Sequence, residues 1–299
     1  MEKLLIIGGT GLIGYHLTEE LKKEKNKYKL YITTRDIIKY DNSINYIYLD
    51  LCKDFDTKKL PQKIDGVIYL AQSRLFREFP EKALNIFKVN VYALEKILDY
   101  SIKTGIKKFI YASSGGVYGN LEKHFSEDMP IHVGNNLGFY LGTKLCGEIL
   151  TDNYSSLLDI VTLRFFFVYG PFQNKNMLIP RLVDNIINSK PIILQGTKGI
   201  KINPIYVTDA VNAIEKCFLL KGSHKINIAG PDILSLSQIA KIIGNKVKKS
   251  PKFVLRNERA NDIIGDIKKM SSILYKPEIA FEAGIEKYLQ ILEEQKKHK

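Results

Sequence analysis

Short apolar runs alternate with amphipathic segments through the first half of the chain. The apolar runs have the length of strands and predict buried strands at 4–7, 29–33, 46–49, 66–71, 108–113 and 160–165. Between them, apolar residues recur at helical spacing, which predicts helices over 12–25, 80–104 and 140–154. Apolar strands that alternate with helices are typical of a parallel sheet covered on both faces. The pattern therefore predicts an α/β fold with a doubly wound parallel sheet.

The regular alternation ends near Gly170, and shorter segments that are richer in Gly and Pro follow it. This change predicts a smaller lobe built partly from the last third of the chain. Neither an internal repeat nor a low-complexity segment interrupts the pattern.

The composition excludes several classes of protein. With 10 Pro, 21 Gly and 3 Cys in 299 residues, the chain is not collagen-like, disulfide-scaffolded or disordered. No apolar run approaches the roughly 20 residues of a membrane span, and the run at 4–7 is too short for a secretory signal. The cysteines are far apart and form no Cys/His cluster, so we expect no metal site. Free thiols and a missing signal predict a cytoplasmic protein with no membrane partner.

The formal net charge of +13 suggests a nucleic-acid or membrane-surface ligand. Most of the 45 basic residues, however, are Lys scattered along the chain rather than Arg. Nucleic-acid readers usually depend on Arg for bidentate contacts. We therefore interpret the charge as a solvated Lys-rich surface and expect no nucleic-acid partner, although the field would favour an anionic small molecule.

A glycine-rich turn joins the first predicted strand to the first predicted helix. Glycines at 8, 11 and 14 permit a tight turn, close approach of the backbone to a pyrophosphate, and close packing of helix on strand. The helix N-terminus would then direct free N–H groups at the anion. This context predicts a Rossmann-type dinucleotide site. Its expected residues are Gly8, Gly11, Leu12, Ile13 and Gly14.

The end of the second predicted strand carries information about the cofactor. An acidic residue is expected there to bind the adenosine ribose, but Thr34 occupies that position and Arg35 follows it. Arg at this place can accept a 2′-phosphate, which favours NADP slightly over NAD. Asp36 comes one or two residues late and could still reach a ribose hydroxyl. The cofactor prediction is therefore NAD or NADP.

Three residues form a candidate catalytic set. Ser114 follows the strand at 108–113, where a parallel sheet meets its ligand. Tyr140 and Lys144 are spaced to share a helix face. A Tyr hydroxyl normally titrates near 10, and a nearby ammonium together with a cationic nicotinamide would lower that pKa. The set can therefore exchange a proton with a substrate hydroxyl while hydrogen leaves the carbon.

The same Tyr-x-x-x-Lys spacing occurs a second time, at Tyr92 and Lys96. That pair precedes the strand of Ser114 and lies on the preceding predicted helix, so we assign it to packing and solvent. The order of glycine turn, Ser114 strand and Tyr140 helix resembles the extended branch of the short-chain dehydrogenase/reductase superfamily. This branch is the NAD-dependent epimerase/dehydratase family, which includes nucleotide-sugar 4-epimerases.

The resemblance extends over nearly the whole chain and implies further site residues. It implies adenine-side contacts from Asp50 and Leu51, although Asp50 can equally be a simple strand-end cap. It implies that the segment Leu70-Ala71-Gln72 passes the nicotinamide ribose, which Lys144 would also bind, and Asn90 stands where the family often has Asn. The segment that contains Arg259 and Asp262 resembles the nucleotide-diphosphate clamp of the family, although a surface salt bridge between the two is an alternative. The substrate residues implied are Ser114, Phe167, Arg259 and Asp262.

The resemblance also implies a division into domains. Residues 1–170 would form the NAD(P)-binding domain, and 205–230 would fold back onto it. Residues 171–204 and 231–299 would form the smaller substrate-binding lobe. Dimers through two helices are usual in the family, so we expect a homodimer through 80–104 and 140–154.

Departures from the family pattern affect the expected substrate. Phe167 and Ile202 stand where members acting on nucleotide sugars often carry Asn and Arg. Gly115 and Gly116 replace the acidic pair with which 4,6-dehydratases remove water, so dehydration is not expected. The leading hypothesis is an NAD(P)-dependent nucleotide-sugar 4-epimerase. The alternatives are an NADP-dependent reductase of a keto sugar or other carbonyl compound, and a non-catalytic cofactor-sensing or RNA-binding protein.

Overall fold

The structure is a computed structural model that describes residues 1–297 except 25, 36–40, 120–123 and 133–136. Asp36, considered above as a ribose ligand, lies outside the described residues. The chain divides into two compact units. The first contains Met1–Val117, Ile131–Arg164 and Val211–Ile226, and the second contains Tyr118–Pro130, Phe165–Ala210 and Asn227–Lys299.

A seven-stranded sheet forms the framework of the first unit, in the order β3-β2-β1-β4-β5-β6-β9. Its strands are β1 (Glu2–Ile7), β2 (Tyr28–Thr34), β3 (Asn45–Tyr48), β4 (Gly66–Tyr69), β5 (Lys108–Ser114), β6 (Asp159–Phe165) and β9 (His224–Ile228). The pairings β1 with β2, β1 with β4, β2 with β3, and β4 with β5 are parallel. The predicted fold class is confirmed, and the six predicted strands agree with the observed ones to within about two residues.

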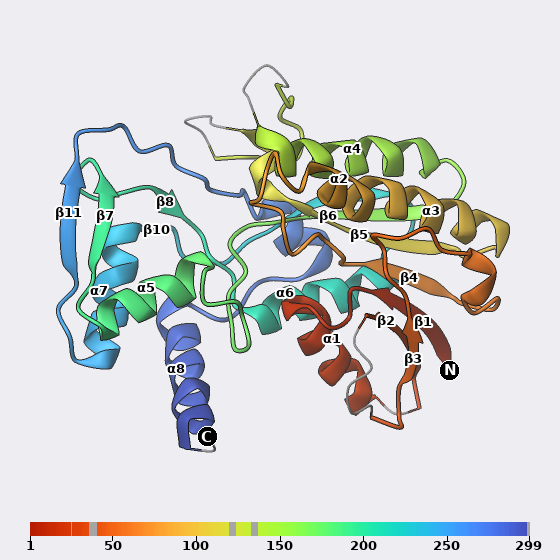
Figure 1. Cartoon of the computed structure of the whole chain (residues 1–299), viewed down its shortest axis with the longest axis horizontal. Helices are drawn as coiled ribbons and strands as arrows, with labels where there is room; N and C mark the ends of the chain where they lie inside the picture. Colours follow the sequence, from red (N-terminus) through yellow and green to blue (C-terminus); the bar gives the residue numbers. More distant parts are fainter. Residues whose placement is uncertain (25, 36–40, 120–123, 133–136, 298–299) are drawn as a thin grey trace. The chain divides into compact units, whose positions relative to one another are not determined.

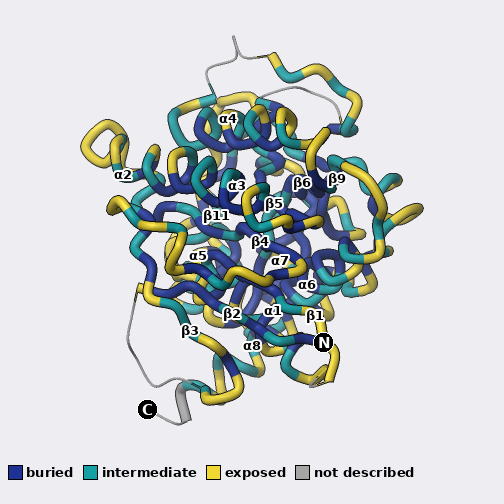
Figure 2. The backbone as a smooth tube through the Cα atoms, turned by 90° about the vertical axis from the view of Figure 1, so that its right-hand side faces the viewer, coloured by how far each residue is buried: buried dark blue, intermediate teal, exposed yellow. Residues whose placement is uncertain are grey.

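The order of the strands determines where a ligand can bind. From β1 the chain runs outward to β2 and β3, and then returns to place β4 and β5 on the other side of β1. This reversal leaves a crevice at the carboxyl ends of β1 and β4, the usual ligand position in open α/β sheets. The residues of β1 from Leu4 to Ile7 are fully buried, as are Val67, Ile68 and Tyr69 in β4. Figure 2 shows this buried central layer between more exposed helices.

Helices cover both faces of this sheet. Figure 1 shows α2, α3 and α4 on one face, and α1 and α6 on the other. Their bounds are α1 (Leu12–Lys23), α2 (Ala83–Phe87), α3 (Ala93–Lys103), α4 (Gly138–Tyr154) and α6 (Val207–Lys216). The helix predicted over 80–104 is interrupted by a π-helical turn at Lys88–Tyr92. The turn contains Asn90, whose buried side chain bonds to groups outside the helix. Such turns are frequent at functional sites.

The second unit contains two short sheets and the helices α5 (Leu178–Ile187), α7 (Leu236–Val247) and α8 (Phe281–Lys297). Strand β11 (Lys252–Arg256) pairs in parallel with β7 (Pro191–Gln195), and β10 (Leu234–Ser235) pairs antiparallel with β8 (Lys201–Ile202). Ser235 starts α7 with a capping box to Gln238, which satisfies N–H groups at the helix start. Within the described ranges, no helix has both the length and the apolar character needed to cross a membrane.

Candidate active site

The glycine turn after β1 leaves no room for a side chain at Gly8 or Gly14. Gly8 has a φ of +89°, and a Cβ there would lie 2.7 Å from the backbone nitrogen of Ala71. A Cβ on Gly14 would lie 2.4 Å from the carbonyl oxygen of Gly8. Helix α1 begins after Gly11 with no side-chain cap, so its first N–H groups remain available to an anion. The predicted residues Gly8, Gly11, Leu12, Ile13 and Gly14 therefore lie together in a turn that fits the pyrophosphate of a dinucleotide.

The loop after β4 lies against this turn. Leu70 donates its backbone N–H to the carbonyl oxygen of Ile7 at 2.9 Å, which extends the β1–β4 pairing beyond the strands. Ala71 is buried against Gly8. The structure thus brings Leu70 and Ala71 to the glycine turn, in the place that the family resemblance implied for a ribose contact.

The residues predicted on the adenine side lie at the ends of β2 and β3. The carboxylate of Asp50 accepts the backbone N–H of Cys52 at 3.1 Å, so it does cap the turn after β3. Leu51 is buried in the core. Arg35 follows β2 and is exposed. Burial and Asp50 raise the pKa of the Cys52 thiol, whereas the positive charge of Arg35 opposes them, which places Arg35 near the turn after β3.

The three catalytic candidates converge at the carboxyl end of β5. Ser114 is the last residue of β5, and its hydrogen bond to the hydroxyl of Tyr140 lowers the pKa of that tyrosine. Tyr140 lies in the first turn of α4 and Lys144 lies one turn later. Lys144 is 2% exposed and donates from Nζ to the carbonyl oxygen of Ala112 in β5 at 2.8 Å. The structure therefore joins all three residues, although their catalytic roles stay a prediction.

Burial shifts the pKa values of the Tyr–Lys pair in opposite directions. Loss of hydration raises the pKa of Tyr140 to about 12, although the Ser114 hydrogen bond opposes this rise. Loss of hydration lowers the pKa of Lys144 to about 8, while the negative charge of Glu148 opposes this fall. In the free protein Tyr140 is therefore a protonated phenol at neutral pH, and additional positive charge is needed before it can act as a base.

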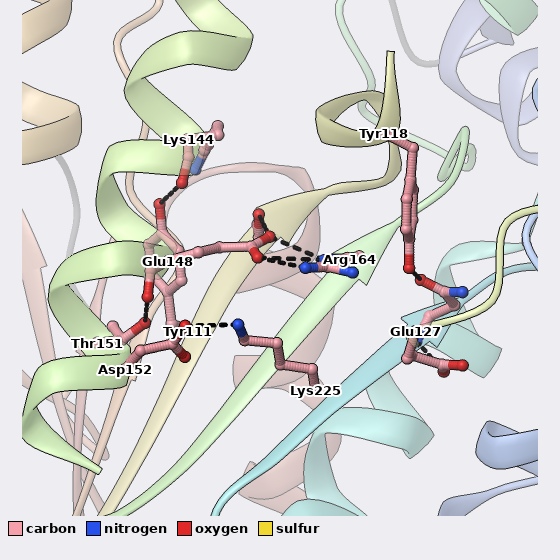
Figure 3. A network of polar contacts seen from close by, with 11 residues as sticks. Tyr111, Tyr118, Glu127, Lys144, Glu148, Thr151, Asp152, Arg164 and Lys225 are labelled. Atoms are coloured by element: carbon pink, nitrogen blue, oxygen red, sulfur yellow. Dashed lines mark hydrogen bonds and ion pairs between the residues drawn. The ribbon is translucent and has the colours of Figure 1, made fainter. Parts of the chain in front are cut away.

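Sequence reasoning missed a buried ion pair below Lys144. Glu148 lies one turn beyond Lys144 on α4 and binds Arg164 of β6, as Figure 3 shows. The Arg164 Nη2 is 2.6 Å from Glu148 Oε2, and its Nε is 3.0 Å from Oε1. Ser113 also donates its hydroxyl to Oε1 at 2.5 Å. A Glu at helical spacing from Lys144, and an Arg inside an apolar strand, were the available signals.

Two polar residues near Tyr140 make contacts that the sequence did not predict. The Tyr140 hydroxyl donates to Gln72 Oε1 at 2.9 Å. Buried Asn90 accepts the backbone N–H of Ser73 at 3.0 Å and donates to the Thr143 hydroxyl at 2.9 Å. Asn90 thus ties the loop after β4 to the helix of Tyr140. Neither contact follows from spacing, because each joins segments that are distant in the sequence.

The predicted substrate residues of the second unit lie in two of its segments. Phe167 follows β6 with a φ of +45°, a left-handed conformation that is uncommon for a bulky residue. Asp262 accepts the backbone N–H of Lys201 at 2.7 Å, and Arg259 precedes it on an exposed stretch. Asn203 forms reciprocal hydrogen bonds with the backbone of Gly265, which fixes the segment after Asp262.

The fold and the match to a family model together identify a dinucleotide-binding enzyme of the extended short-chain dehydrogenase/reductase type. The model of the NAD dependent epimerase/dehydratase family matches residues 4–229, and the chain belongs to this family.

Relatives of known name include epimerases and dehydratases. The UDP-glucuronate 4-epimerase of Thermodesulfobacterium geofontis is 28% identical over 306 residues, which cover 95% of this chain and 94% of that protein. The dTDP-D-glucose 4,6-dehydratase of Mus musculus is 26% identical over 317 residues, covering 97% of this chain and 88% of that protein. The crystal structure of the UDP-glucuronic acid 4-epimerase from Bacillus cereus with UDP-glucuronic acid and NAD has a TM-score of 0.87. It is 25% identical and covers 98% of this chain and 99% of that one.

Proposed function

We propose that this protein is an NAD(P)-dependent nucleotide-sugar 4-epimerase. The observation that carries the proposal is the convergence of Ser114, half-buried Tyr140 and buried Lys144 at the end of β5. The glycine turn of Gly8, Gly11 and Gly14 and the family membership add to it. NAD or NADP, when bound, supplies the acceptor and then the donor of the hydrogen that leaves and returns to C4 of the sugar.

The chain's own residues supply the proton chemistry. Tyr140 takes the proton of the C4 hydroxyl during oxidation and returns it during reduction. Ser114 donates a hydrogen bond to the same oxygen and holds it near the Tyr140 hydroxyl. The Lys144 ammonium lowers the pKa of Tyr140 electrostatically. Lys144 would also hold the nicotinamide ribose beside the carboxyl end of β5. Epimerisation then needs the keto sugar to turn before the hydrogen returns on its other face.

Epimerisation is favoured over dehydration by the residues that follow Ser114. Elimination of water needs a general acid and a general base at the two positions after Ser114. This chain has Gly115 and Gly116 at those positions. A Cβ on Gly116 would lie 2.7 Å from Cδ2 of Leu141, the neighbour of Tyr140. An acidic residue at 116 would therefore require Leu141 to move.

The substrate class comes from the second unit and from the relatives. We assign the diphosphate to Arg259, whose planar guanidinium can bond phosphate oxygens in pairs. Asp262 and Phe167 complete the proposed substrate residues. The epimerase relatives named above act on UDP-sugars, so UDP is the first nucleotide to test. Arg35 favours NADP over NAD and keeps the reductase as a second candidate.

We also propose a cytoplasmic homodimer. Large apolar side chains are exposed along α2 and the π-helical turn, and another is exposed on α4: Leu84, Phe87, Tyr92 and Ile149. Such a row on a monomer marks an interface. The three cysteines are free thiols, as expected of a reducing compartment. Sedimentation equilibrium should give about twice the 34.1 kDa chain mass, and Leu84→Glu should shift the protein toward monomer.

The function is tested by incubating the enzyme with UDP-, GDP- and dTDP-sugars and catalytic NAD or NADP, and following C4 epimers by NMR. Epimer formation that Tyr140→Phe abolishes would support the proposal. Net consumption of NADPH would favour the reductase. Absence of turnover with every sugar would contradict both functions.

A further inference from the structure

Gln72 is the side chain that accepts the hydrogen bond of the Tyr140 hydroxyl, with Oε1 at 2.9 Å from the phenol oxygen. It stands in the loop after β4 and is half-buried. The Phe76 ring, from the same loop, packs on the Tyr140 ring at 4.9 Å between centroids. Gln72 and Ser114 thus approach the tyrosine hydroxyl from two different strand ends.

A carboxamide oxygen can only accept a hydrogen bond, and a phenolate can only accept one as well. The observed contact therefore exists only while Tyr140 is protonated. In the observed orientation Gln72 therefore favours the protonated form of Tyr140.

The backbone on both sides of Gln72 is held in place. Ala71 is buried against Gly8, so a shift there would collide with the glycine turn. Ser73 donates its backbone N–H to Asn90 at 3.0 Å and its hydroxyl to Asn85 at 2.6 Å. The loop therefore holds Gln72 in a fixed position beside the Tyr140 hydroxyl.

We propose that Gln72 is a positioning residue whose amide oxygen holds Tyr140 protonated at rest, and that this contact is lost when Tyr140 gives up its proton. It thereby sets the pH range in which Tyr140 works as a base. This inference rests on the proposed function for its use in catalysis, but the contact itself can be tested without substrate.

The other ionisable groups around Tyr140 come from three elements. Lys144 and, behind it, Glu148 lie on α4, and Tyr111 lies on β5 with its Oη directed at the backbone of α4. Arg77, from the loop after β4, lies over the Phe76 ring at 5.1 Å. A change confined to residue 72 alters none of these charges, so its effect on Tyr140 is separable from theirs.

The test titrates the protein with ¹³C at the tyrosine Cζ, saturated with NAD⁺, and assigns the Tyr140 signal by its loss in Tyr140→Phe. Gln72→Met keeps the length of the side chain but removes the acceptor that favours the phenol. It should lower the Tyr140 midpoint by about one pH unit, a tenfold change in the acid dissociation constant. Gln72→Glu places a carboxylate there and should raise the midpoint.

Gln62→Met is the matched control, because Gln62 precedes β4 and donates to a backbone carbonyl, that of Leu60 at 2.8 Å, away from Tyr140. It should leave the midpoint unchanged. Equal midpoints in wild type and Gln72→Met, or no titration of Tyr140 in Gln72→Met before the fold is lost, would overturn the proposal. Midpoints that move as expected in a protein that epimerises no nucleotide sugar would contradict the proposed function and leave the contact's role intact.

Discussion

Two Tyr-x-x-x-Lys segments of this chain have the same spacing and opposite surroundings. Lys96 donates to Asp54 Oδ1 and to the Phe55 carbonyl oxygen, both at 2.6 Å, and Tyr92 is exposed. Lys144 is buried, and its Nζ contacts a backbone carbonyl rather than a carboxylate. The first pair lies near the surface beside an acid, and the second lies at the carboxyl end of the sheet.

The surroundings give the two lysines opposite electrostatics. The hydrogen bond to Asp54 is the main cause that raises the pKa of Lys96, so its charge is already neutralised by a partner. Burial lowers the pKa of Lys144 to about 8, and its nearest carboxylate, Glu148, is held by Arg164. The charge of Lys144 is thus available to a neighbouring phenolate. Tyr-x-x-x-Lys spacing alone therefore does not make a proton-transfer pair. The surroundings of Tyr140 and Lys144 suit proton transfer, whereas those of Tyr92 and Lys96 do not.

The largest difference between the two segments is expected in catalysis. Tyr140→Phe removes the proposed acid–base group and should lower kcat about 10³-fold. Tyr92→Phe should leave kcat unchanged. Both variants are assayed for C4 epimers under substrate saturation, with circular dichroism as the check on folding. Equal losses in the two variants would contradict the assignment of Tyr140.

The largest loss of folding stability is expected when the buried ion pair between Glu148 and Arg164 is broken. Glu148→Gln leaves Arg164 buried without its counter-charge and should cost about 3–5 kcal/mol in urea denaturation. The double variant Glu148→Gln with Arg164→Met removes the stranded charge and should recover part of that loss. Asp99→Asn, which removes the partner of exposed Lys103, is the control and should not change the midpoint. A single variant as stable as wild type would show that the pair is not desolvated.

The buried lysine should also make stability depend on pH. Its pKa is about 8 in the folded protein and 10.5 in the reference state, so the unfolded chain binds more protons between these values. The free energy of unfolding should therefore rise with pH relative to Lys144→Met, by up to about 3 kcal/mol between pH 8 and 10.5. A constant difference between the two proteins over this window would contradict the lowered pKa.

The smallest effect is expected at Lys96. Lys96→Met removes its contact with the exposed Asp54, far from the candidate site, and should leave both kcat and its pH profile unchanged. Lys144→Met, measured in parallel, should lose activity and weaken cofactor binding. A loss in Lys96→Met comparable to that in Lys144→Met would show that the first segment also contributes to the site.

The sequence predicted what depends on local pattern. Apolar runs identified β1, β4 and β5, because strands buried on both faces have no polar alternation. The glycine spacing predicted the turn at Gly8, since few other residues tolerate its φ or the nearby Ala71 backbone. The pair Tyr140 and Lys144 followed from its place after the Ser114 strand.

What the sequence left open depends on contacts between distant segments. The acceptor of the Tyr140 hydroxyl is Gln72, which α2, α3 and β5 separate from Tyr140 in the sequence. The π-helical turn at Lys88–Tyr92 interrupts a continuous helical pattern where Asn90 bonds to Ser73 and Thr143. The Arg164–Glu148 pair forms across β6 and α4. None of these partners has a fixed spacing, so only the folded chain identifies them.

The most direct test of the account uses UDP-glucuronate deuterated at C4, with NAD present in catalytic amount. The enzyme should form the C4 epimer and retain the deuterium at C4, because hydrogen leaves and returns without exchange with water. Tyr92→Phe should give the same labelled product at the same rate, and Tyr140→Phe should give none. Loss of the label to solvent, or an unimpaired Tyr140→Phe, would contradict the account.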